Sequence, residues 1–133
     1  MTAVKVLDAY AILAFLEDEP SAGQVRNLLL RAEEGKAKLA MTVVNLGEVW
    51  YAIARTNSPD LANQLVQEIR GMAIELVDVD WALAQEAASL KAKGKISYAD
   101  CFAAGLARIR KGEVVTGDPE FKRLEGEVKV AWL

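Results

Sequence analysis

The chain has 133 residues, which suits one domain, and its hydrophobic fraction of 53% and charged fraction of 26% are typical of a globular protein. It contains no histidine and one cysteine, which excludes Ser-His-Asp and Cys-His catalysis, histidine-ligated zinc and an internal disulfide. The net charge of −3 argues against nucleic-acid binding through overall basicity, although a local basic groove remains possible. Because we find neither a long apolar run nor a signal-peptide pattern, we expect a single cytoplasmic domain over residues 1–133.

Short β-rich runs alternate with segments of helical spacing along the whole chain. In chain order, we predict a strand (3–8), helices (9–18 and 22–36), a strand (38–42), helices (43–56 and 58–72), a strand (73–79), helices (80–94 and 97–110), a strand (113–116), a short helix (119–126) and a strand (128–132). Strands that alternate with helices predict a parallel sheet covered by helices.

Three of these helices have recognisable start signals. Ser21 is predicted to cap the helix that follows it, Ser58 precedes a proline at the first helical position, and Asp80 is a predicted N-cap. Cys101 lies inside a predicted helix and is interpreted as a small buried hydrophobic residue.

Asp100 lies within a stripe of small apolar residues in "ISYADCFAAGLA" and shares a helix face with Ala103, Ala104 and Ala107. Burying an ionised carboxylate is costly unless it is paired or binds a metal. Two interpretations are open: Asp100 forms a capping box with Ser97, or it is a metal ligand.

Three further acids stand at informative positions. Asp8 ends the first strand and Asp118 precedes Pro119, so each could be a simple helix N-cap. Glu48 is the only charged residue between Val43 and Ala54, where a solvated helix edge is the plain alternative.

The predicted topology brings these acids to one place. In an open parallel sheet, ligands bind beyond the carboxyl ends of the strands, and the helices that return from that edge begin there. Two carboxylates about 5 Å apart repel by roughly 3 kcal/mol at an effective dielectric constant near 20. Divalent cations would relieve this repulsion, and an all-oxygen ligand set favours Mg²⁺ or Mn²⁺.

The chain resembles the PIN-domain nucleases, most closely the VapC-type toxins of toxin–antitoxin pairs. The resemblance spans the chain and is carried by "VLDAYAILAFL" with Asp8, "NLGEVWYAI" with Glu48, "SYADCFAAGLA" with Asp100, and "VVTGDPEF" with Thr116 and Asp118. It implies a three-layer α/β/α sandwich around a mostly parallel sheet, one or two Mg²⁺ or Mn²⁺ ions, and endonucleolytic cleavage of RNA. It also implies a homodimer and inhibition by a small antitoxin protein. Family members often have Ser or Thr after the first Asp, where this chain has Ala9.

We expect Asp8 and Asp100 to bind metal most directly, with Asp118 and Glu48 completing the site. Thr116 is expected to orient a carboxylate or water through its hydroxyl. Asn45, one turn before Glu48, is a candidate for the same role or a simple polar residue at a helix start.

Basic residues are candidate contacts for RNA phosphates, and the alternative is an ordinary solvated face. The candidates are Lys91, Lys93 and Lys95, just before the Asp100 helix, and Arg55, at the end of the Glu48 helix.

Two other functions fit parts of this pattern. One is a PIN-like binding or scaffold module with weak catalysis, which the missing hydroxyl at Ala9 would favour and the retained acids oppose. The other is a small phosphate-handling α/β hydrolase or receiver-like domain. A receiver-like domain would require a second acid beside Asp8, which this chain lacks, and no GxxxxGK[ST] nucleotide loop is present.

Overall fold

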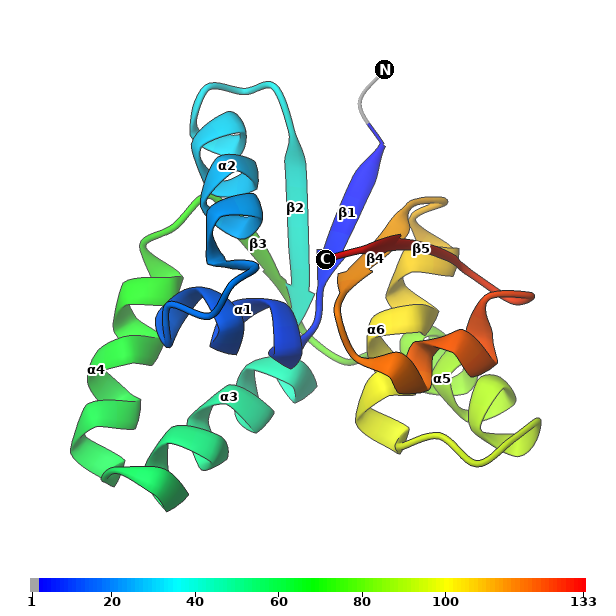
Figure 1. The fold of residues 1–133 in the computed structure, drawn as a ribbon. Coiled ribbons are helices and arrows are strands. Elements are labelled where there is room, and N and C mark those ends of the chain that lie inside the picture. The colour runs from blue at the N-terminus through cyan, green and yellow to red at the C-terminus, as the bar shows by residue number, and fades with distance from the viewer. Residues whose placement is uncertain (1–2) are drawn as a thin grey trace.

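The computed structural model describes residues 3–133 and contains a five-stranded sheet in which every neighbouring pair of strands is parallel. The strand order is β3-β2-β1-β4-β5 (Figure 1). The strands are β1 (Val4–Leu7), β2 (Lys38–Thr42), β3 (Ile74–Val77), β4 (Glu113–Thr116) and β5 (Lys129–Trp132). The predicted parallel sheet is therefore confirmed.

Helices cover both faces of the sheet, which gives the three-layer sandwich. One face carries α1 (Ala9–Leu16), α2 (Ala22–Glu33), α3 (Val43–Thr56) and α4 (Pro59–Arg70), and the other carries α5 (Trp81–Ala92), α6 (Tyr98–Ile109) and η1 (Pro119–Leu124) (Figure 1). The element η1, predicted as an ordinary short helix, is a 3-10 helix. Among residues 3–133, none of these helices has the length and hydropathy needed to cross a membrane.

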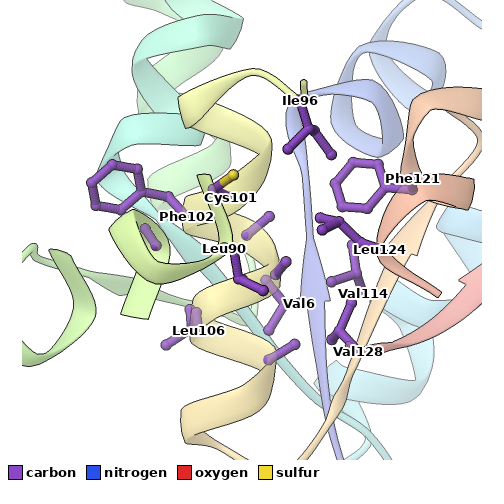
Figure 2. Packing of buried hydrophobic residues seen from close by; sticks show 14 of the residues in the cluster. Val6, Leu90, Ile96, Cys101, Phe102, Leu106, Val114, Phe121, Leu124 and Val128 are labelled. Atoms are coloured by element: carbon purple, nitrogen blue, oxygen red, sulfur yellow. The ribbon is translucent and has the colours of Figure 1, made fainter. Parts of the chain in front are cut away.

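Each face of the sheet has its own apolar core. Figure 2 shows the core on the α6 side, where Val6 and Val114 of the sheet pack with Leu90, Leu106 and Phe121 from the covering helices. Cys101 belongs to this core and is fully buried, as the sequence predicts. Burial of such side chains is the main term that holds η1 and α6 against the strands.

Most of the predicted helix starts are confirmed, and one is wrong. Ser58 accepts a hydrogen bond from the amide of Leu61 at 3.1 Å, and Asp80 accepts one from Leu83 at 2.9 Å. Ser21 makes no capping hydrogen bond through its side chain. Its backbone has φ −84° and ψ 0°, whereas a capping side chain needs the extended conformation to reach the next turn.

The strand order reverses between β1 and β4. Successive strands β1, β2 and β3 are laid down in one direction, and the chain then returns over α5 and α6 to place β4 on the other side of β1. The ends of β1 and β4 are thus neighbours, with Leu7 opposite Val115, although more than a hundred residues separate them. Crevices at such switch points are the usual ligand sites of open α/β sheets.

Gly112, in the turn before β4, permits the close approach of β1. A Cβ atom at Gly112 would lie 1.9 Å from the carbonyl oxygen of Val4, a backbone atom that cannot move without disturbing the sheet. We predict that Gly112→Ala lowers the free energy of unfolding by about 2–3 kcal/mol. Gly47→Ala, a matched change at an exposed helical position with open space around it, should raise this free energy by about 0.5–1 kcal/mol. Urea denaturation measures both, and equal effects of the two substitutions would contradict this account of Gly112.

Candidate active site

Asp8 is buried at the switch point, with 2% of its surface exposed. It follows β1 and caps α1, so one carboxylate oxygen, Oδ1, accepts a hydrogen bond from the amide of Ala11 at 2.9 Å. The other oxygen, Oδ2, accepts one from the Thr116 hydroxyl at 2.5 Å. Burial raises the pKa of Asp8 to about 7, against the opposing effect of these two hydrogen bonds, and the charges of Asp100 and Asp118 raise it further.

Thr116 joins two of the predicted acids. It ends β4, is fully buried, and donates to Asp8 while its own oxygen accepts the amide N–H of Asp118 at 3.0 Å. Asp118 in turn caps η1, because its Oδ1 accepts the amide of Glu120 at 2.9 Å. A single hydroxyl thus fixes the position of Asp118 relative to Asp8.

Asp100 lies in the first turn of α6 and is only 8% exposed. Ser97 caps this helix by accepting the amide N–H of Asp100 at 3.1 Å. Within residues 3–133 no backbone amide donates to the Asp100 carboxylate, so the capping box is formed in one direction only. Burial raises the pKa of Asp100 to about 6, opposed by the Ser97 hydroxyl and reinforced by the charges of Asp118, Glu48 and Glu120.

Glu48 is held by a buried polar network at the start of α3. Thr42 caps the helix through the amide of Asn45 and donates its hydroxyl to the Asn45 side-chain oxygen at 2.5 Å. The Asn45 amide group, fully buried, donates to Glu48 Oε1 at 3.0 Å and to the carbonyl of Ala99 at 3.1 Å. Burial raises the pKa of Glu48 against the effect of the Asn45 hydrogen bond, and the charge of Asp118 adds to the rise. Because Ala99 precedes Asp100, Asn45 connects the Glu48 helix to the Asp100 helix.

The structure thus brings the four predicted acids to one edge of the sheet, where the starts of α1, α3 and α6 gather (Figure 1). Asp118 is the common neighbour, since its charge raises the pKa of each of the other three. Glu120 also belongs here, because one carboxylate oxygen from each of Asp100, Asp118 and Glu120 lies within 4.8 Å of the others. Sequence reasoning missed Glu120, although its place two residues after Asp118 in "GDPEF" was a usable signal.

The residues at this edge fit a hard divalent cation. They supply carboxylate oxygens and no nitrogen or sulfur donor, as Mg²⁺ and Mn²⁺ prefer. The buried carboxylate of Asp100 has no cationic partner within 4.0 Å among residues 3–133, and its pKa is raised rather than lowered. A cation bound there would stabilise the ionised carboxylate of Asp100 and so offset the unfavourable burial of its charge.

The predicted RNA-binding residues lie in different surroundings. The Lys91 ammonium group donates to the carbonyl of Ile96 at 2.6 Å, which ties down the loop before α6. Lys93 forms an ion pair with Glu127 at 3.2 Å, and the side chain of Lys95 is exposed. Arg55 lies seven residues beyond Glu48 in α3, roughly 10 Å along the helix, with its guanidinium 5.4 Å from the centre of the Tyr51 ring.

The doubly covered parallel sheet and the carboxylates at its switch point define an α/β protein with a candidate divalent-metal centre. A sequence profile of the PIN domain matches residues 5–127. The chain therefore belongs to the PIN domain family, as its resemblance to that family implied. A comparison with curated proteins found no match.

Solved structures confirm the fold over nearly the whole chain. VapBC2 from Rickettsia felis, bound to a promoter DNA fragment, is similar with a TM-score of 0.72 at 19% identity, covering 96% of this chain and 97% of that one. DNA-bound VapBC from Salmonella typhimurium gives 0.73 at 18% identity, covering 98% of both chains. Mycobacterium tuberculosis VapC20, a toxin that cleaves the sarcin-ricin loop, gives 0.70 at 17% identity, covering 93% and 95%.

We predict that Thr116→Val lowers the free energy of unfolding by about 1–3 kcal/mol, because the Asp118 amide and Asp8 Oδ2 both lose a buried partner. Thr116→Ser keeps the hydroxyl and is the matched control, with an expected loss below about 1 kcal/mol. Urea denaturation of the two variants measures the difference. A larger loss for the serine variant would assign Thr116 to apolar packing instead.

The raised acid pKa values predict a pH-dependent stability of the metal-free protein. Because the folded protein holds protons on Asp8 and Asp100 more tightly than the unfolded chain, this stabilisation is complete below about pH 4. It is lost as the pH rises through their folded pKa values of about 6 and 7.

Asp100→Asn should therefore raise the melting temperature in EDTA by about 3–5 °C near pH 8, with little change near pH 4. Thermal melts at the two pH values test this directly. A lower melting temperature of the variant at both would favour a structural role for the Asp100 carboxylate at the start of α6.

Proposed function

We propose that this protein is a metal-dependent endoribonuclease and the toxin of a toxin–antitoxin pair. The observation that carries the proposal is the convergence of buried, mutually repelling carboxylates at the switch point of a PIN-domain fold. Membership of the PIN family supports nuclease chemistry, and the VapC20 neighbour is itself named as a toxin that cleaves the sarcin-ricin loop.

In this proposal Asp8 and Asp100 hold the metal most directly, while Asp118, Glu48 and Glu120 complete the site, directly or through water. One or two bound Mg²⁺ or Mn²⁺ ions would lower the pKa of an attacking water and neutralise charge on the leaving oxygen. Thr116 holds the Asp8 carboxylate by its hydroxyl. Asn45 does the same for Glu48, so both acids are fixed before metal or substrate arrives.

The absence of a hydroxyl at Ala9 need not abolish activity. Both oxygens of Asp8 already have a hydrogen-bond donor, one from the Ala11 amide and one from Thr116. We expect Thr116 to supply the orienting hydroxyl that residue 9 does not.

The proposed partners are an RNA substrate and a small antitoxin, and the protein is expected to act in the cytoplasm as a homodimer. Several neighbours are VapBC assemblies, and one is titled a toxin-antitoxin complex, from Klebsiella pneumoniae. Large apolar side chains on the helices remain exposed, including Trp50, Tyr51 and Trp81 at 37%, 48% and 73%. Such residues are enriched at protein interfaces.

We predict that the purified protein cleaves single-stranded RNA with Mg²⁺ or Mn²⁺ and that EDTA stops it. Asp8→Asn and Asp100→Asn should each reduce cleavage by at least ~100-fold, because each removes a charge that the metal requires. Gel analysis of a labelled RNA measures the rate. Asp60→Asn, an exposed acid in the first turn of α4, is the control and should cleave at the parent rate.

Circular dichroism should show that the Asn variants retain the fold. We call the sheet edge that carries Asp8, Glu48, Asp100, Asp118 and Glu120 the acidic edge. Folded Asn variants that cleave as fast as the parent would show that the acidic edge is not the active site. RNA binding without any metal-dependent cleavage by the parent would favour a binding or scaffold role.

A further inference from the structure

A pocket of about 430 Å³ lies between the loop that precedes α6 and the end of η1. Figure 2 shows two of its apolar residues, Ile96 and Leu124, on either side of Phe121. The pocket combines an apolar floor with a charged rim. The floor consists of Leu90, Ile96 and Leu124, and the rim of Lys93, Lys95, Arg123 and Glu127.

The same two segments form both the pocket and the acidic edge. The loop over residues 93–97 leads directly into the first turn of α6, where Asp100 lies. Element η1 carries Glu120 near its start and Arg123 near its end. Side chains three residues apart in a 3-10 helix share a face, and one turn rises about 6 Å. Arg123 therefore follows Glu120 along one face, at a distance comparable with one extended nucleotide.

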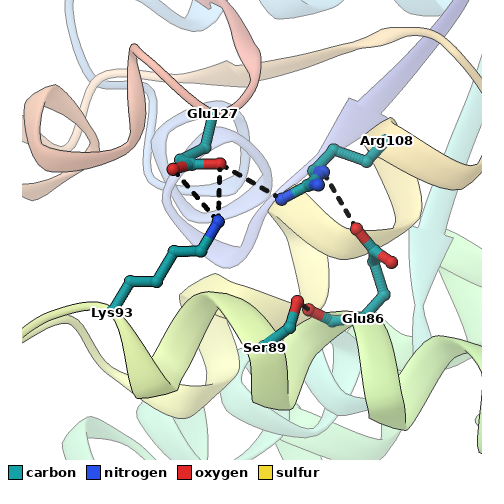
Figure 3. A network of polar contacts seen from close by, with 5 residues as sticks. All are labelled: Glu86, Ser89, Lys93, Arg108 and Glu127. Carbon is teal, nitrogen blue, oxygen red and sulfur yellow. Dashed lines mark hydrogen bonds and ion pairs between the residues drawn. The ribbon is translucent and has the colours of Figure 1, made fainter.

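The rim carries an excess of positive charge. Glu127 is the rim's acid, and it is neutralised by Lys93 at 3.2 Å and by Arg108 at 3.4 Å (Figure 3). Lys95 and Arg123 have no carboxylate partner within residues 3–133. The Arg123 guanidinium donates to the backbone carbonyl of Lys95, which holds Arg123 at the loop that carries Lys95 and leaves most of its five N–H donors free.

We propose that this pocket is a nucleotide subsite for RNA that runs through the acidic edge. Lys95 and Arg123 contact a phosphate beside the one that is cleaved, and the apolar floor receives the attached ribose or base. The inference rests on the proposed ribonuclease function and deepens it by assigning the path of the substrate. Of the three lysines predicted to bind RNA, Lys95 is assigned to the subsite. Lys91 and Lys93 are not, because their ammonium groups already bind other groups of the protein.

RNA fits this pocket better than an acidic peptide for two reasons. RNA carries one phosphate per nucleotide. One phosphate can therefore contact Lys95 and Arg123 while the neighbouring phosphate lies at the proposed metal centre. The pocket, about 430 Å³ in volume, also has room for a ribose or nucleobase above its apolar floor, whereas a string of acidic side chains would leave that space unused.

The test measures RNA binding with cleavage blocked. A fluorescein-labelled single-stranded RNA is titrated with the Asp100→Asn protein in EDTA, with and without the pair Lys95→Ala/Arg123→Ala. The expected result is an affinity at least ~10-fold weaker and a salt dependence, d log K/d log [salt], that is smaller by about 0.7, the value for one lost phosphate contact on a single strand. Lys95→Ala alone should give about half of that change in slope. This variant should fold, because the Lys95 side chain is exposed and makes no hydrogen bond or ion pair within residues 3–133.

The matched control is the pair Lys38→Ala/Lys129→Ala, which removes the same charge from the opposite, amino edge of the sheet. It should change RNA affinity by less than about twofold. Equal weakening by both pairs, or no weakening by either, overturns the subsite.

Cleavage by the full chain distinguishes this failure from failure of the proposed function. If Lys95→Ala/Arg123→Ala cleaves RNA with an unchanged KM, the subsite is wrong and the nuclease stands. If the parent never cleaves RNA but its binding depends on the pair, the subsite stands and the nuclease is wrong.

Discussion

The structure depends on a pair of hydrogen bonds at the point where the strand order reverses. The Thr116 hydroxyl donates to Asp8 and accepts from the amide of Asp118, so it connects the ends of β1 and β4 across a separation of 108 residues. Burial, and to a smaller extent the charges of the neighbouring acids, raise the pKa values of Asp8 and Asp100 beside it. The two strands can nevertheless hold them close, because backbone pairing and two apolar cores stabilise the sheet on both faces. Strand pairing and apolar packing thus offset the unfavourable burial of charge at the acidic edge.

Capping and ligand binding are compatible roles for the acids at this edge. Asp8 and Asp118 each use Oδ1 to cap a helix, which leaves the other oxygen of Asp118 free for a cation. Capping also fixes the rotamer of each carboxylate, because the donor N–H belongs to a rigid helical turn. Asp100 differs, since no backbone amide binds its carboxylate in the part of the chain that the structure describes. A cation would therefore supply the partner that backbone amides give to Asp8 and Asp118 but not to the Asp100 carboxylate.

The sequence predicted the order of elements, the parallel sheet and the acids that converge, because these follow from hydrophobic period and from the rule that parallel strands end at one edge. It could not predict what depends on side-chain reach. Ser21 fails as a cap because of its backbone angles, and Asp100 leaves the capping box incomplete. Glu120 joins the acids from the start of η1, a 3-10 helix whose side-chain directions the hydrophobic period does not predict. The ion pair between Lys93 and Glu127 depends on how distant parts of the chain pack together, which hydrophobic periodicity does not predict.

The distribution of charge around η1 is what a phosphodiester would require. A metal centre attracts the scissile phosphate, but a chain with a net charge of −3 and five carboxylates at one edge repels the rest of a polyanion. Cations must therefore stand close to the acids without neutralising them. Lys95 and Arg123 meet this condition, because the loop before α6 and the far end of η1 keep them at the pocket while Asp100 and Glu120 stay at the edge. Glu127, the acid on the pocket rim, pairs with Lys93 and Arg108 and so does not neutralise Lys95 or Arg123. One short 3-10 helix thus carries both signs of charge, one turn apart, as the proposed RNA path requires.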